Sequence, residues 1–249
     1  MESVYTSAIL IGLGFAPSLV WLAYFLKKDP RPEPKYIVSR VFFLGIILAP
    51  LAVIAQGILR GIGLYFNPNF QPTSSLIFLF WAAFVEEVTK FLPVKFAVLH
   101  NPEFDEPVDS MEYMIAAAMG FAAIENVLVL FQTIPGGAIV TFQTWALRFI
   151  GATLLHAVSS AMVGYFLALA WFYNKHSQKL IFLGITIATV FHFTFNTILA
   201  KGDEQTSFLY SIAFLAAVAL LISSLFTKIK EQSGKTEGFK NLSTESILP

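Results

Sequence analysis

Ionisable and amide side chains interrupt the most apolar stretches of this sequence at four places. The four interruptions are Glu86-Glu87 with Lys90, Glu125-Asn126, Arg148 with His156, and His192 with Asn196. An ionisable group inside a bilayer costs roughly 2.5–3.5 kcal/mol on insertion scales. Glutamates and histidines together transfer protons and bind metals, so the pattern predicts an enzyme with its active site inside the membrane.

These residue types favour hydrolysis by water. A glutamate beside imidazoles can activate water as a general base, either directly or on a bound metal. Two histidines and a carboxylate, here His156, His192 and Glu125, would also form a zinc site with an open position for water. Asn196 follows His192 by four residues on the same helical face, and the two side chains can donate hydrogen bonds to the oxyanion of a tetrahedral intermediate.

The two adjacent glutamates are expected to have different roles. Glu86 and Glu87 diverge by about 100° on a helix and cannot both point at one site. We expect one to perform chemistry and the other to pair with Lys90 on the next turn or with Arg148 on another helix. Lys90, Arg148 and Asn126 are therefore interpreted as charge partners of the acids.

The composition predicts a polytopic membrane protein. The chain of 249 residues is 56% hydrophobic and 13% charged, whereas a soluble chain is about half apolar and about a quarter charged. Its formal net charge of zero argues against a nucleic-acid partner. The sequence contains no cysteine, which excludes disulfides, thiolate ligands and a cysteine nucleophile.

Apolar runs of about 20 residues or more predict an all-α bundle of about seven transmembrane helices. These runs are Val4–Leu26, Tyr36–Gly61, Ser74–Val98, Met111–Gln132, Phe142–Tyr173, Leu180–Ala200 and Ser207–Ile229. The fifth run is long for a single crossing. Residues 230–249 are polar, so we divide the chain into a membrane domain, 1–229, and a disordered tail, 230–249.

Basic residues between the runs predict the orientation. They gather on one side of the membrane at Lys27, Lys28, Arg31, Lys35, Arg40, Lys175, Lys179, Lys228, Lys230, Lys235 and Lys240. The positive-inside rule then places the N-terminus outside and the C-terminus in the cytoplasm. A rise of about 1.5 Å per residue puts the polar groups in the middle and outer half of the bilayer.

The motifs, taken in order, resemble those of the PrsW family of intramembrane proteases. The matching motifs are Glu86-Glu87-Val-Thr-Lys90, Asp109…Tyr113, Gly120-Phe121-Ala-Ala-Ile-Glu125-Asn126, Arg148…His156 and His192-Phe-Thr-Phe-Asn196. The connector Asp29-Pro30-Arg31-Pro32-Glu33-Pro34 is similar to a proline- and acid-rich segment of that family. The resemblance extends from about Tyr24 to Asn196 and implies a protease in the bacterial cell membrane that cleaves membrane-anchored regulators such as anti-sigma factors.

The PrsW family is similar to a wider group that includes CaaX prenyl endopeptidases and bacterial CPBP proteins. That group has a paired-glutamate motif, a Phe-x-x-x-His motif and a His-x-x-x-Asn motif. In this sequence Glu125 follows Phe121 at the place where the wider group has histidine.

The resemblance also implies roles for individual residues. Glu86 or Glu87 would activate water, and His156 and His192 would assist or bind a metal. Asn196 with His192 would stabilise the oxyanion.

Two other classes of function stay open at this stage. Buried carboxylates with basic residues also suit an ion-coupled transporter, although the regions around Glu86 and Glu125 share only a short similarity and no inverted repeat. A non-catalytic membrane scaffold with the same fold is the other alternative. A serine nucleophile is not favoured, because Ser159 and Ser160 lack a glycine-rich nucleophile elbow.

Overall fold

The computed structural model describes residues 2–27, 31, 33–173 and 176–245, and its regular elements are helices. They are α1 (Glu2–Leu26), α2 (Lys35–Phe66), η1 (Pro72–Ser74), α3 (Leu76–Ala97), α4 (Asp109–Thr133), η2 (Ile134–Gly136), α5 (Gly137–Ile150), α6 (Ala152–Phe172), α7 (Ser177–Lys201) and α8 (Glu204–Glu245). The all-α prediction is confirmed. Of the connector and the basic residues named above, Lys28, Asp29, Pro30, Pro32 and Lys175 lie outside the described residues.

Several helices are long and apolar enough to cross a membrane. The described chain contains five such segments, namely Val4–Leu26, Lys35–Phe66, Asp109–Phe172, Ser177–Lys201 and Gln205–Ser233. Helix α3 is not among them because Glu86, Glu87, Lys90 and Lys95 lie on it. The protein is thus a multi-pass membrane protein, while seven crossings and the orientation of the termini remain predictions.

The fifth predicted run, Phe142–Tyr173, is divided between two helices. Helix α5 ends at Ile150, α6 begins at Ala152, and Gly151 separates them. The Gly151 amide donates to Leu147 O at 2.8 Å, and its carbonyl accepts from Leu155 N at 2.9 Å. A Cβ at Gly151 would lie 2.7 Å from Leu147 O, so a residue without a side chain permits this junction. The run that is long for a single crossing is thus two consecutive helices.

Helix α4 forms the centre of the bundle. It packs against α1, α2, α3, α5 and α6, and its residues from Asp109 to Ala123 are buried. Its crossing with α2 is very close, because a Cβ at Gly45 would overlap Ala117 O and one at Gly120 would overlap Phe42 O. Small residues allow such approach between membrane helices.

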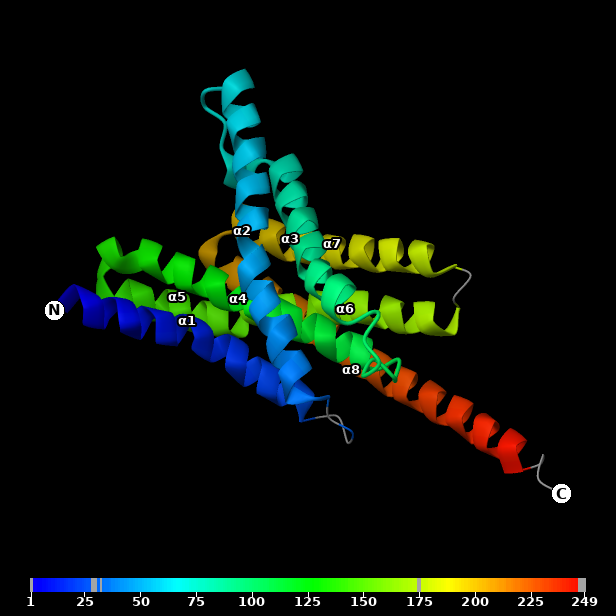
Figure 1. Ribbon diagram of the computed structural model, residues 1–249. Coiled ribbons are helices and arrows are strands. Elements are labelled where there is room, and N and C mark those ends of the chain that lie inside the picture. The colour runs from blue at the N-terminus through cyan, green and yellow to red at the C-terminus, as the bar shows by residue number, and fades with distance from the viewer. Residues whose placement is uncertain (1, 28–30, 32, 174–175, 246–249) are drawn as a thin grey trace.

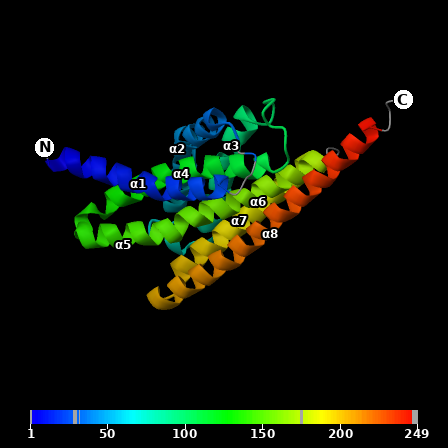
Figure 2. The same ribbon diagram turned by 90° about the horizontal axis from the view of Figure 1, so that it is seen from below.

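The helices on either side of α4 have different directions. The hairpin of α2 and α3 crosses the other helices and its tip projects beyond them (Figure 1). Seen from below, α2 and α3 lie on one side of α4 and α6, and α8 lies on the other (Figure 2). Helix α3 packs against α4, α6 and α7, and α6 packs against α4 and α7. These four helices carry Glu86, Glu87, Lys90, Glu125, His156 and His192.

Helix α8 begins at a side-chain cap and ends well beyond the last apolar run. The Asp203 carboxylate accepts from Thr206 N at 3.0 Å and Thr206 Oγ1 at 2.5 Å, and these hydrogen bonds hold the pKa of Asp203 below its usual value. The helix continues to Glu245, so it includes most of the segment for which the sequence predicts a disordered tail. Lysine, glutamate and glutamine in this segment are good helix formers. The division of the chain at residue 230 stays a prediction.

Candidate active site

The carboxylate of Glu87 lies at the centre of a buried network. Glu87 Oε1 accepts from Lys90 Nζ at 2.6 Å, His192 Nδ1 at 2.8 Å and Ser159 Oγ at 3.0 Å. Ser160 Oγ donates to Glu87 Oε2 at 3.5 Å. The side chains of Glu87 and Lys90 are both 0% exposed. Of the two adjacent glutamates, it is Glu87 that pairs with Lys90.

Glu86 has one oxygen in a different situation. Gln56 on α2 donates from Nε2 to Glu86 Oε1 at 2.9 Å. Glu86 Oε2 is buried and accepts no hydrogen bond from the described residues; it lies 3.5 Å from His192 Nε2. Sequence reasoning missed Gln56, although a lone amide inside the apolar run of α2 is a signal of its own.

His156 on α6 connects Lys90 on α3 with Glu125 on α4. Its Nδ1 lies 2.9 Å from Lys90 Nζ, and its Nε2 lies 2.6 Å from Glu125 Oε2. Because an ammonium group only donates, the contacts imply that Nδ1 accepts and that Nε2–H donates to Glu125. The His156 and His192 rings are 5.2 Å apart at their centroids and nearly perpendicular.

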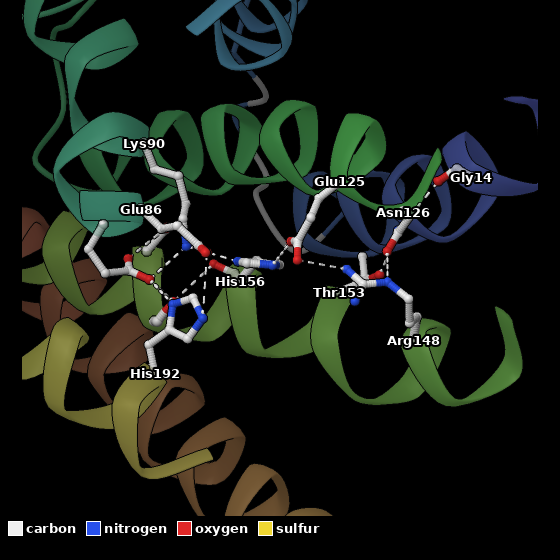
Figure 3. Close-up of polar contacts among 12 residues, drawn as sticks. Gly14, Glu86, Lys90, Glu125, Asn126, Arg148, Thr153, His156 and His192 are labelled. Carbon is white, nitrogen blue, oxygen red and sulfur yellow. Dashed lines mark hydrogen bonds and ion pairs between the residues drawn. The ribbon is translucent and has the colours of Figure 1, made fainter. Parts of the chain in front are cut away.

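Arg148 ends the network on the side of α5 (Figure 3). Its Nη2 lies 3.2 Å from Glu125 Oε1, an ion pair without the alignment of a hydrogen bond. Arg148 Nε donates to Asn126 Oδ1 at 2.7 Å, and Asn126 Nδ2 donates to Thr153 Oγ1 at 3.0 Å and to Gly14 O at 3.4 Å. The Asn126 amide thus fixes α1, α5 and α6 around α4.

Asn196 is not part of this network. The residue is half-buried on α7, one turn beyond His192. Its side chain has no hydrogen bond or ion pair with the described residues. Asp109 and Tyr113, the other residues of the ordered motifs, lie in another contact group: Tyr113 Oη donates to Glu33, and Asp109 Oδ2 accepts from Glu106 N at 2.8 Å.

The donor atoms of Glu86, His156 and His192 lie within 4.8 Å of one another, a spacing that suits a metal ion. His192 gives its Nδ1 to Glu87, which leaves Nε2 directed at Glu86. A carboxylate that orients the far nitrogen of a histidine is the usual support of a metal ligand. The buried Oε2 of Glu86, without a hydrogen bond, also fits a ligand position. Glu125, which the sequence places among the ligands, instead contacts His156 and Arg148.

Comparison with known proteins identifies the family of this chain. A family model described as PrsW family intramembrane metalloprotease matches residues 33–222. The chain belongs to this family. The match includes all four polar interruptions of the apolar runs, so the resemblance of the ordered motifs to PrsW proteases is confirmed.

Individual members of the PrsW family are similar over most of the chain. A Protease PrsW from Geobacillus kaustophilus is 28% identical over 226 residues, which are 90% of this chain and 92% of the relative. One from Oceanobacillus iheyensis is 30% identical over 78% of this chain and 83% of its own length. One from Bacillus subtilis is 29% identical over 76% and 82%. No solved structure matches.

Membership of the PrsW family makes this protein an intramembrane protease, and therefore a hydrolase of protein substrates, located in bacteria in the cell membrane. The family assignment therefore supports the protease hypothesis over the transporter and scaffold hypotheses. The buried glutamate and two histidines are the side chains of this metalloprotease that could hold its metal ion.

Proposed function

We propose that Glu86, His156 and His192 bind a zinc ion and that the site cleaves a single-pass membrane protein. Glu86 Oε2 carries this proposal, because this buried carboxylate oxygen accepts no hydrogen bond from the described part of the chain and lies beside the available nitrogen of His192. Two imidazoles and one carboxylate are a common zinc set in hydrolases, with a fourth position open. When bound, the ion supplies Lewis acidity to water and to the scissile carbonyl.

The two histidines are prepared for this role to different degrees. His192 keeps Nδ1 on Glu87 and can use Nε2 without losing a hydrogen bond. His156 uses both ring nitrogens, so as a ligand it must release either Lys90 or Glu125. His192 and Glu86 are therefore the primary ligands, and His156 completes the set by exchanging a partner.

Glu125 is the carboxylate that we assign to proton transfer. Its side chain is 32% exposed, against 11% for Glu86 and 0% for Glu87. Glu125 accepts a proton from water as the water oxygen bonds to the scissile carbonyl carbon. It returns that proton to the amide nitrogen as the C–N bond breaks, and Arg148 stabilises its charge between turnovers.

Asn196 is assigned to the developing oxyanion. It lies one helical turn beyond His192, and its amide donors have no partner among the described residues. An uncommitted amide can donate to negative charge that appears only during the reaction. The basic loops support an outside N-terminus, and with that orientation the chemistry would take place in the outer half of the bilayer. The family resemblance points to membrane-anchored regulators, such as anti-sigma factors, as substrates.

The test is metal analysis of the purified protein in nanodiscs, together with cleavage of a fluorescent single-pass peptide. The wild type should carry about one zinc per chain, and Glu86→Gln and His192→Gln should lose both zinc and cleavage. The chain has four histidines, so His100→Gln and His176→Gln are matched controls and should retain both. Equal zinc in all variants would refute the ligand set, and normal cleavage by Glu86→Gln would refute the site itself.

A further inference from the structure

A cavity of about 860 Å³ lies beside Arg148, at one end of the active-site network. Helices α5, α6, α7 and α8 all contribute to its lining, which is mostly apolar. Cavities of about 300–1,000 Å³ are typical of sites that hold a ligand. This volume is large enough for several amino-acid residues.

Two lining residues connect the cavity to the active site. Arg148 lines the cavity and its Nη2 contacts Glu125 at 3.2 Å. Phe195 also lines it and lies three residues after His192 on α7. The network in Figure 3 runs from Glu86 and His192 through His156 to Arg148, so its Arg148 end is at the cavity.

The cavity is open to the side of the bundle. Its lining includes Leu147, Ile150, Leu199 and Phe208, each of which is more than half exposed. Exposed apolar side chains on a membrane protein face lipid. A membrane-embedded segment can therefore enter from the bilayer without crossing water.

The hydroxyl of Ser211 is a buried polar group in the wall of the cavity. Ser211 on α8 lines the cavity and is only 5% exposed, and its hydroxyl forms no hydrogen bond with the described residues. A buried hydroxyl left in this state costs free energy that a ligand could recover. Hydroxyls such as those of Thr89 and Thr189 instead donate to the preceding turn of their own helix.

We propose that this cavity binds the unwound stretch of the substrate's transmembrane segment next to the scissile bond. The inference rests on the proposed function of the adjoining site. A protease must expose a peptide bond that a membrane helix keeps within its own hydrogen bonds, and each freed backbone group in lipid needs a new partner. Ser211 and the guanidinium group of Arg148, whose Nη2 forms no hydrogen bond with the described residues, supply such partners, and the apolar lining receives the side chains.

The absence of cysteine from the sequence allows a direct test by disulfide formation. Single-cysteine variants Leu199→Cys and Phe208→Cys, in a Glu86→Gln background, are placed in nanodiscs with a synthetic Leu/Ala membrane peptide. The peptide carries Gly-Cys-Gly about two turns from one end. Under a mild oxidant, both variants should cross-link at least tenfold more than Ile47→Cys, which is 66% exposed on α2. The same peptide with Ala-Cys-Ala, which stays helical, should cross-link less.

A matched pair of substitutions on α8 tests the volume of the cavity. Ser211→Leu fills it and should reduce cross-linking to Leu199→Cys about tenfold. Ser223→Leu lies on the same helix but lines another cavity, between α1, α6 and α8, and should leave cross-linking unchanged. The proposal is overturned by equal cross-linking at Leu199→Cys and Ile47→Cys, or by no effect of Ser211→Leu. Cross-linking is read without cleavage, so a wild type that fails to cut the peptide would count against the catalytic assignment alone.

Discussion

His192 Nδ1 lies 2.8 Å from Glu87 Oε1, the same oxygen that accepts from Lys90 Nζ. The carboxylate that neutralises a fully buried ammonium group therefore also sets the ring orientation of a proposed metal ligand. A change at Glu87 should affect both stability and chemistry, whereas a change at Glu86 should affect chemistry alone.

Glu87→Gln should destabilise the protein strongly, because it leaves the Lys90 charge buried without its counter-ion. Removing one partner of a buried pair costs about 3–5 kcal/mol. Glu87→Gln/Lys90→Met removes both charges and should recover most of that loss. Thermal unfolding in a mild detergent would measure it. If the single variant unfolds at the wild-type temperature, Glu87 does not hold Lys90 in the folded protein.

Gln56→Leu should reduce cleavage roughly 10–100-fold, the usual effect of removing a group that orients a metal ligand. Gln56 Nε2 fixes Glu86 Oε1, so its loss lets the carboxylate turn. Zinc affinity should fall by a similar factor, measured by competition with a chelator. Gln132→Leu, an exposed glutamine on α4, is the control and should change neither quantity.

Arg148→Gln should lower the cleavage rate while zinc content stays at the wild-type value. Arg148 contacts Glu125 and Asn126 and none of the proposed ligands. Because Arg148 stabilises the ionised form of Glu125, its loss should shift the acidic limb of the pH–rate profile to higher pH. Arg60→Gln on the exposed face of α2 is the control. A loss of zinc in Arg148→Gln would instead indicate that Arg148 maintains the metal site.

Gly120→Ala should destabilise the bundle by about 1–3 kcal/mol, the usual cost of overpacking. Its new Cβ would overlap the Phe42 carbonyl oxygen at the crossing of α2 and α4. Gly57→Ala on α2 meets nothing within 4 Å and should leave the unfolding temperature unchanged or slightly higher. Equal effects of the two substitutions would show that the two helices do not approach so closely.

The all-α fold and the charged residues inside its apolar runs can be predicted from the sequence, because both are local properties of the chain. It does not distinguish Glu86 from Glu87, because that difference depends on Ser159, Ser160 and His192 arriving from other helices. The boundary at Gly151 is missed since α5 and α6 are both apolar.

Long-range partners also determine the surroundings of Glu125 and Asn196. Glu125 follows Phe121 by four residues, and its oxygens contact Arg148 from α5 and His156 from α6; its role as a metal ligand stays a prediction. Spacing puts His192 and Asn196 on one face of α7, yet only His192 reaches the network. Gln56 could have been found from its isolation in an apolar run.

The buried network carries three carboxylates and two fixed cations, Lys90 and Arg148. Lys90 is an internal counter-ion that the chain brings with it, so the bundle can close around Glu87 before any metal arrives. Folding of the bundle around Glu87 and occupation of the proposed ligand set are then separable steps, because Lys90 already balances the Glu87 charge.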